Sequence, residues 1–173
     1  DLCSSDLGAE ELMSLVPIGT FVDHGPSREA PRAPPPGTPP QPPRPSGYDT
    51  YLAAIGNRPH TVLQAGQVLR LGALTVTAVN SDGEVVGAPL TPGAAPVPEC
   101  RALTFKAETG GEENPRSLGV VMQWGAARVL ALADTTWDME NRLACPRNLI
   151  GPVDLMFVEK TNPVDPVTPE QQA

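Results

Sequence analysis

Asp134 is the residue of this chain best placed for chemistry. It directly follows the apolar run Ala127–Ala133 and precedes the polar pair Thr135 and Thr136. Such a run predicts a buried strand, and a carboxylate at the end of a core strand projects into solvent or a cleft, where it can bind a metal or a substrate. Aspartate also caps helices, however, and a short helix is predicted at Trp137–Leu143. Taken alone, the local sequence favours the helix cap.

Three further side chains are candidates for the rim of such a site. Asn114 and Ser117 lie just before another apolar run, either as part of a functional loop or as ordinary loop hydrogen-bonding groups. His24 ends a short apolar run, where it can touch a ligand or simply fill a turn. His60, the other histidine of the chain, stands beside a proline and is interpreted as structural. No residue is identified as a catalytic acid, base or nucleophile.

The three cysteines, Cys3, Cys100 and Cys145, lack the C-x-x-C spacing of a zinc knuckle or a thioredoxin-like site. A disulfide between Cys100 and Cys145 is favoured, because each lies near a proline in loop-like stretches that flank the same predicted hairpin. Unpaired thiols explain the sequence equally well. The cysteines therefore leave the compartment open, cytoplasmic or exported.

Composition and charge limit the kinds of partner. The chain has a formal charge of −8, with 22 prolines and 16 glycines among 173 residues. This balance argues against a broad binding surface for nucleic acid or anionic lipid, although a local phosphate contact is compatible with it. No apolar run approaches the roughly 20 residues needed to cross a bilayer. We therefore expect a bacterial-type soluble protein without a transmembrane segment, of undetermined oligomeric state.

The hydrophobic pattern predicts an α/β fold with mixed β-sheets flanked by helices. The strongest signal is a buried hairpin at residues 117–123 and 127–133. Helices are expected at residues 8–15, 48–55 and 137–143. Besides the two strands of the hairpin, strands are expected at residues 18–23, 61–63, 67–71, 74–79, 84–86 and 153–158. Residues 61–86 are interpreted as a β-meander, and residues 153–158 as a final buried strand. Residues 88–113 are expected to form a surface excursion with one short strand at residues 102–106.

Three segments are set apart from this domain, which is expected to span residues 8–160. Residues 1–7 read as a non-native scar at the N-terminus, and residues 161–173 as a flexible tail. Residues 31–45 are dominated by proline, which favours extended, solvated backbone. They are interpreted as an inserted surface loop, although a ligand for an SH3-type or WW-type partner domain is the alternative.

Several stretches together resemble one known family. They are residues 21–26 (FVDHGP), 113–121 (ENPRSLGVV), 130–137 (LALADTTW) and 145–148 (CPRN). In order and spacing they are similar to the stand-alone relatives of the competence-protein (ComEC-like) branch of the metallo-β-lactamase superfamily. The resemblance implies part of an αββα sandwich and a hydrolase that depends on zinc or another divalent metal.

The resemblance also implies roles for the candidate residues. Asp134 matches the aspartate that bridges two metal ions, although Ala133 stands where the branch often has glycine. Asn114 and Ser117 match its asparagine–serine loop beside the active site, and His24 would lie on the active-site side of the sheet. The implied reaction is hydrolysis by a metal-activated water, with a phosphodiester or nucleic acid as the favoured substrate class.

Two departures from the family pattern limit what this chain is expected to do. No H-x-H-x-D-H motif is present, and the late His-His-Gly segment is replaced by Glu159-Lys160-Thr161-Asn162. A single aspartate cannot hold a catalytic metal against solvation by water. We therefore expect a fragment of a metal-dependent hydrolase that is inactive alone and does not retain its metal. The alternative is a non-catalytic or degenerate interaction module that uses the proline-rich loop.

Overall fold

A computed structural model of the chain describes residues 11–28, 47–90, 95–102 and 113–157. The proline-rich segment at residues 31–45 and the tail expected from residue 161 lie outside the described residues. The chain divides into two compact units, Asp1–Val62 and Leu63–Ala173, and each is described separately below. Within the described ranges, none of the helices has both the length and the apolar character that crossing a membrane requires.

The first unit contains a small parallel sheet and a helix. Strand β1 (Phe21–Asp23) pairs with β2 (His60–Val62), so that Phe21 lies opposite His60. Helix α2 (Gly47–Ile55) connects them in sequence and confirms the helix expected at residues 48–55. The residue after its last turn is Gly56, which takes a φ of +61° that glycine adopts without steric cost. A further helical turn covers residues 11–15.

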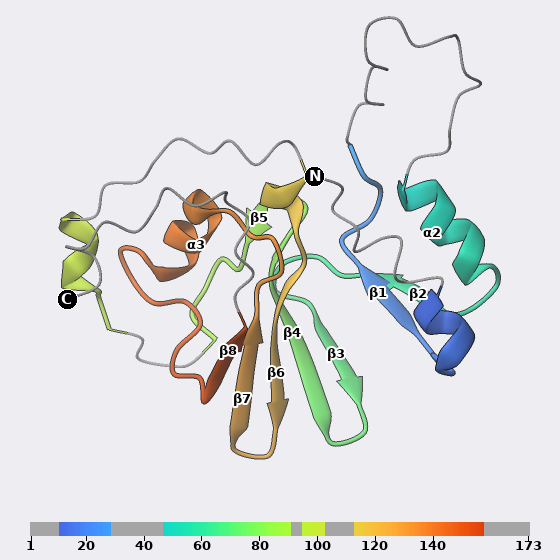
Figure 1. Ribbon diagram of the computed structural model, residues 1–173. Coiled ribbons are helices and arrows are strands. Elements are labelled where there is room, and N and C mark those ends of the chain that lie inside the picture. The colour runs from blue at the N-terminus through green and yellow to red at the C-terminus, as the bar shows by residue number, and fades with distance from the viewer. Residues whose placement is uncertain (1–10, 29–46, 91–94, 103–112, 158–173) are drawn as a thin grey trace, which may run out of the picture. The chain divides into compact units, whose positions relative to one another are not determined.

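The second unit is built on a mixed sheet (Figure 1). Its strands are β3 (Val68–Leu71), β4 (Leu74–Ser81), β5 (Glu84–Val85), β6 (Gly119–Trp124), β7 (Ala127–Ala131) and β8 (Leu155–Phe157). They run in the order β3-β4-β6-β7-β8, with β5 paired to β4. All neighbours are antiparallel except β7 and β8. Two expectations are thereby confirmed, the mixed α/β class and the hairpin of β6 and β7.

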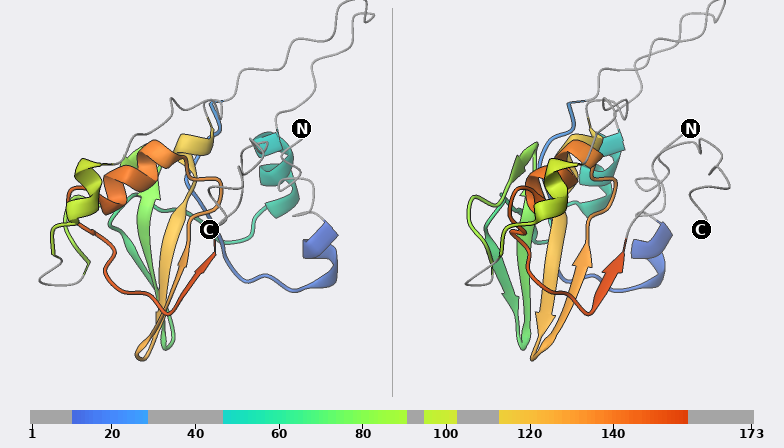
Figure 2. Two further views of the ribbon diagram at one scale, coloured as in Figure 1. Left: turned by 60° about the vertical axis from the view of Figure 1, so that its left-hand side comes forward. Right: turned by 90° about the vertical axis from the view of Figure 1, so that its left-hand side faces the viewer.

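One face of this sheet carries the hydrophobic core. Helix α3 (Trp137–Ala144) lies across that face (Figure 2), and its Leu143 packs with Val79, Val121 and Leu130. Leu143, Val79 and Val121 are each at most 3% exposed. Two short 3-10 turns, η1 (Pro98–Arg101) and η2 (Asn114–Arg116), complete the described elements.

Two sequence-based expectations differ from the structure. β2 pairs with β1 in a separate sheet, so residues 61–86 are not one continuous meander. The strand expected at residues 102–106 is a separate case, because residues 103–106 lie outside the described residues. The last strand is exposed rather than buried, because β8 lies at the edge of the sheet and has one neighbour, β7, among the described strands. An apolar run predicts a strand but not its position in the sheet.

Candidate functional site

The candidate site lies where three strands of the second unit meet. Antiparallel pairing brings the last residues of β4, the first residues of β6 and the last residues of β7 together, since Asn80 pairs with Gly119 and Val120 with Ala131. We call this the loop end of the sheet. The turns of the β3–β4 and β6–β7 hairpins lie at the opposite end (Figure 1). Loops at one end of a rigid sheet commonly carry functional side chains.

Asp134 lies in the turn between β7 and α3 at this loop end. The preceding residue, Ala133, has a φ of +50°, a left-handed conformation that non-glycine residues adopt only at a cost. Glycine would adopt it freely. The N-cap of α3 is Thr136, so the interpretation of Asp134 as the helix cap is wrong. Its side chain is partly buried.

Asn80 holds the Asp134 turn in place from the end of β4. Its side chain is fully buried, and its amide nitrogen donates to the Ser117 carbonyl oxygen at 2.7 Å and to the Thr135 hydroxyl oxygen at 2.9 Å. The Thr135 hydroxyl in turn donates to the Leu132 carbonyl oxygen. A single amide therefore fixes the turn after β7 against the loop before β6. The sequence suggested no such role for Asn80, because it reads as part of an ordinary Asn-Ser-Asp-Gly turn.

The packing around the Asn80 side chain is tight. A Cβ atom on Gly119 would lie 1.9 Å from Oδ1 of Asn80 and 3.1 Å from Leu132. Oδ1 itself is buried and accepts no hydrogen bond from any residue within the described ranges. Only glycine at position 119 allows the asparagine to enter this space.

The loop containing Asn114 and Ser117 also reaches the loop end. Asn114 begins the turn η2, and its carbonyl oxygen accepts a hydrogen bond of 3.1 Å from the Ser117 backbone nitrogen. Arg116 forms an ion pair with Asp82, whose backbone nitrogen donates to the Arg116 carbonyl oxygen at 3.0 Å. The structure thus brings Asn114, Ser117 and Asp134 to one end of the sheet. His24 belongs to the first unit, directly after β1.

The loop end does not form a metal site by itself. Among the described residues, no three His, Cys, Asp or Glu side chains come close enough together to hold an ion. Asp134 supplies one carboxylate there, and a structural or catalytic zinc needs three or four protein ligands. The donors among the described residues therefore do not fit a resident metal.

A disulfide joins Cys100 and Cys145, the pair favoured from the sequence. The two Cα atoms are 5.7 Å apart, and the bond ties the turn η1 to the residue after α3. It thereby fastens part of the excursion at residues 88–113 to the helix that follows Asp134. A second link is the backbone hydrogen bond of 2.9 Å from Val97 to Pro146.

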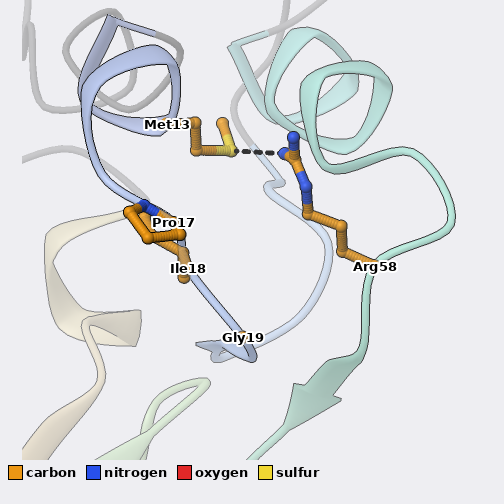
Figure 3. Close-up of a pocket in the computed structure, with 5 residues that line it drawn as sticks. All are labelled: Met13, Pro17, Ile18, Gly19 and Arg58. Atoms are coloured by element: carbon orange, nitrogen blue, oxygen red, sulfur yellow. Dashed lines mark hydrogen bonds between the residues drawn. The ribbon is translucent and has the colours of Figure 1, made fainter.

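The first unit contains two other features that could bind or transform a ligand. One is a pocket of about 380 Å³ (Figure 3), lined by Met13, Pro17, Ile18, Gly19 and Arg58. The other is a contact of 2.5 Å between Nε2 of His60 and Oδ2 of Asp23. The sequence interpretation of His60 as structural did not anticipate this pair, because the two residues are far apart in sequence.

The chain was compared with protein-family models, with curated proteins and with solved structures. None of the three comparisons finds a match.

Proposed function

We propose that this chain contributes one wall of the active site of a metal-dependent hydrolase, with Asp134 as a metal-bridging carboxylate. The proposal combines the family resemblance of the sequence with the position of Asp134 at the loop end. Its histidine ligands would come from an H-x-H-x-D-H segment that this sequence lacks. A phosphodiester is the proposed substrate class.

The proposal is supported chiefly by the burial and hydrogen bonding that fix the turn containing Asp134. The two residues that follow it, Thr135 and Thr136, are 5% and 2% exposed, and Asn80 bonds directly to the first of them. A buried network that fixes a partly exposed carboxylate is typical of a preorganised ligand, which must keep its position while the ion binds. A helix cap would not need this support, and Asp134 does not cap α3.

Zinc stoichiometry tests the proposal. We expect the present chain to bind less than one zinc ion per molecule by isothermal titration calorimetry, because one carboxylate is too few ligands. A longer chain that includes an upstream H-x-H-x-D-H segment should bind about two ions and hydrolyse bis-p-nitrophenyl phosphate. In that longer chain Asp134→Asn should lower both the metal content and the rate.

A neighbouring carboxylate provides the control. Asp82 also lies at the loop end but pairs with Arg116, so Asp82→Asn should leave the zinc stoichiometry unchanged. Tight, stoichiometric zinc binding by the present chain would contradict the proposal, as would an upstream reading frame without the histidine motif.

A further inference from the structure

The first unit contains a histidine that is oriented by a carboxylate. His60 is the first residue of β2 and pairs with Phe21, while Asp23 lies two residues further along β1. Residues two apart on a strand share a face, so the side chains of Asp23 and His60 project from the same side of the sheet. Nε2 of His60 and Oδ2 of Asp23 are 2.5 Å apart, and both side chains are largely buried, with 24% and 16% exposed.

The carboxylate of Asp23 is itself held in place. Its other oxygen, Oδ1, accepts a hydrogen bond of 2.8 Å from the backbone nitrogen of Gly25. That nitrogen is positioned by a φ of +99°, which glycine adopts readily. The carboxylate therefore has little freedom to turn away from His60.

The ring of His60 is also confined. The Tyr51 ring packs edge-on against it, with centroids 6.3 Å apart and an angle of 84° between the planes. Phe21 packs in turn on Tyr51 with a centroid distance of 6.2 Å. Aromatic contacts of this kind fix the plane of an imidazole as well as its position.

This arrangement decides which ring nitrogen of neutral His60 is basic. An ionised carboxylate only accepts hydrogen bonds, so Nε2 must carry the proton that is donated to Asp23. Nδ1 then keeps its lone pair. In the part of the chain that the structure describes, no donor or acceptor bonds to Nδ1. A carboxylate that holds the proton-bearing nitrogen of a histidine also stabilises the imidazolium formed when the other nitrogen takes up a proton.

A pocket opens where the two strands begin. Gly19 and Arg58, which line it, lie two residues before β1 and β2 respectively. Met13, Pro17 and Ile18 give the pocket apolar walls (Figure 3), and its volume of about 380 Å³ suits a small organic molecule. Arg58, one of its lining residues, stands two positions before His60 in the sequence.

We propose that Asp23 and His60 form a general-base site in the first unit, which hydrolyses small carboxylic esters with an apolar acyl group. Nδ1 of His60 takes a proton from a water molecule as the water oxygen bonds to the ester carbonyl carbon. The bond from that carbon to the alkoxy oxygen then breaks, and the imidazolium returns its proton to the leaving alkoxide. The products are the carboxylic acid and the alcohol. His60 is the catalytic residue and Asp23 a positioning residue.

The test measures hydrolysis of p-nitrophenyl butyrate by the full chain. All proteins carry Cys3→Ser, which removes a thiol that would react with the ester, and all assays contain EDTA. His60→Asn should lower the second-order rate constant at least about tenfold, since a positioned general base contributes a factor of this size or more. Asp23→Asn should cause a loss of similar size.

The two tyrosines of α2 provide a matched pair. Tyr51→Ala removes the ring that packs edge-on against His60 and should lower the rate severalfold. Tyr48→Ala removes a ring of the same helix whose described ring contact is with Tyr51 and should have a much smaller effect on the rate. Equal rates for the parent protein and His60→Asn would overturn the proposal.

A spectroscopic measurement keeps the test decisive if His60→Asn does not fold. Two-bond proton–nitrogen NMR spectra identify the tautomer of each histidine, and the chain has only two of them. His60 should show the Nε2–H tautomer in the parent protein and lose this preference in Asp23→Asn, because the carboxylate accepts the hydrogen bond from Nε2. A His60 in the Nδ1–H form would overturn the proposal. Because EDTA is present throughout, the outcome is independent of the metal-dependent activity proposed for Asp134.

Discussion

At the scale of single residues, Asn80 has the largest structural role at the loop end. It is fully buried, and each of its two amide hydrogens bonds to a different loop. A buried amide of this kind is costly unless its hydrogen bonds are made, so removing one partner leaves the others unsatisfied. The position of Asp134 thus depends on a side chain that would not itself touch a ligand.

Asn80→Ala should therefore destabilise the protein. The Ser117 carbonyl and the Thr135 hydroxyl oxygen would each lose their donor, at a cost of about 2–3 kcal/mol in the free energy of unfolding. Urea unfolding followed by circular dichroism measures this loss. Gln123→Ala removes an exposed amide from β6 and should change the stability by less than about 0.5 kcal/mol. Equal stabilities of the two variants would contradict the role given to Asn80.

Gly119→Ala tests the same packing from the opposite strand. Its Cβ would lie 1.9 Å from Oδ1 of Asn80, so one of the two must move, at a cost of about 2–3 kcal/mol. Gly87→Ala is the control, because a Cβ there meets no atom within 4 Å. The double variant Asn80→Ala with Gly119→Ala should lose less stability than the sum of the two single variants. Additive losses in thermal or urea unfolding would show that the two positions do not compete for the same space.

The sequence indicated some of these residues and not others. Asp134 is detectable because it follows a strong apolar run, although the local sequence alone favoured a helix cap that the structure assigns to Thr136. Asn80 and the pair of Asp23 with His60 act through partners 37 or more positions away. A periodic pattern carries no information about such partners, so these contacts required the tertiary structure.

At the scale of elements, hydrophobic patterning predicted best where the elements are local. Helices α2 and α3 and the β6–β7 hairpin lie within one or two residues of their expected positions. Pairings between distant segments were not predicted. β1 and β2 are parallel and separated by α2, and a parallel pair has no turn signature in the sequence. For the same reason the edge position of β8 could not be anticipated.

The packing of α2 against β1 predicts an alkaline pH dependence. Burial, with the charge of Asp23 and a hydrogen bond to it, raises the pKa of Tyr51 above its ordinary value near 10. Burial and the charge of Asp23 raise the pKa of Tyr48 as well. A group with a raised pKa in the folded state stabilises the fold at lower pH. Its contribution is lost as the pH rises from about 10 through the folded-state value.

Ultraviolet titration of tyrosinate checks this shift, and the chain has only two tyrosines. Both should ionise at higher pH in the native protein than in concentrated urea, and Tyr51→Phe should remove the later of the two transitions. In Tyr48→Phe the later transition should persist. Coincident native and unfolded titration curves would contradict the raised pKa values of the two tyrosines.

The disulfide between Cys100 and Cys145 gives a prediction about the link from η1 to α3. It closes a loop over a sequence separation of 45, and cross-links of this span stabilise by about 2–4 kcal/mol. Cys100→Ser with Cys145→Ser should therefore lower the melting temperature, and a reducing agent should lower that of the parent protein similarly. Cys3→Ser is the control and should change neither. A parent protein whose melting temperature is insensitive to reduction would contradict this contribution.

At the scale of the whole molecule, charge limits the size of any phosphodiester substrate. The chain has 20 acidic residues against 12 lysines and arginines. Several described arginines are already engaged, since Arg116 pairs with Asp82, Arg142 pairs with Glu84, and Arg128 donates to backbone carbonyls. Affinity for duplex DNA comes mainly from lysine and arginine contacts to phosphates. The phosphodiester proposed for the loop end must therefore be recognised by local contacts.

We accordingly expect the chain to bind a fluorescent DNA duplex more weakly than about 0.1 mM at physiological salt, the weak end of the range for non-specific binding. Fluorescence anisotropy measured at low and at physiological salt is the appropriate assay. Saturable micromolar binding that weakens steeply with salt would reveal a basic surface that the net charge conceals. Weak binding, together with phosphodiesterase activity of a metal-loaded longer chain, would instead favour a small substrate at the loop end. The acidic composition would then restrict the substrate, because net negative charge repels long polyanions more strongly than a single phosphodiester group.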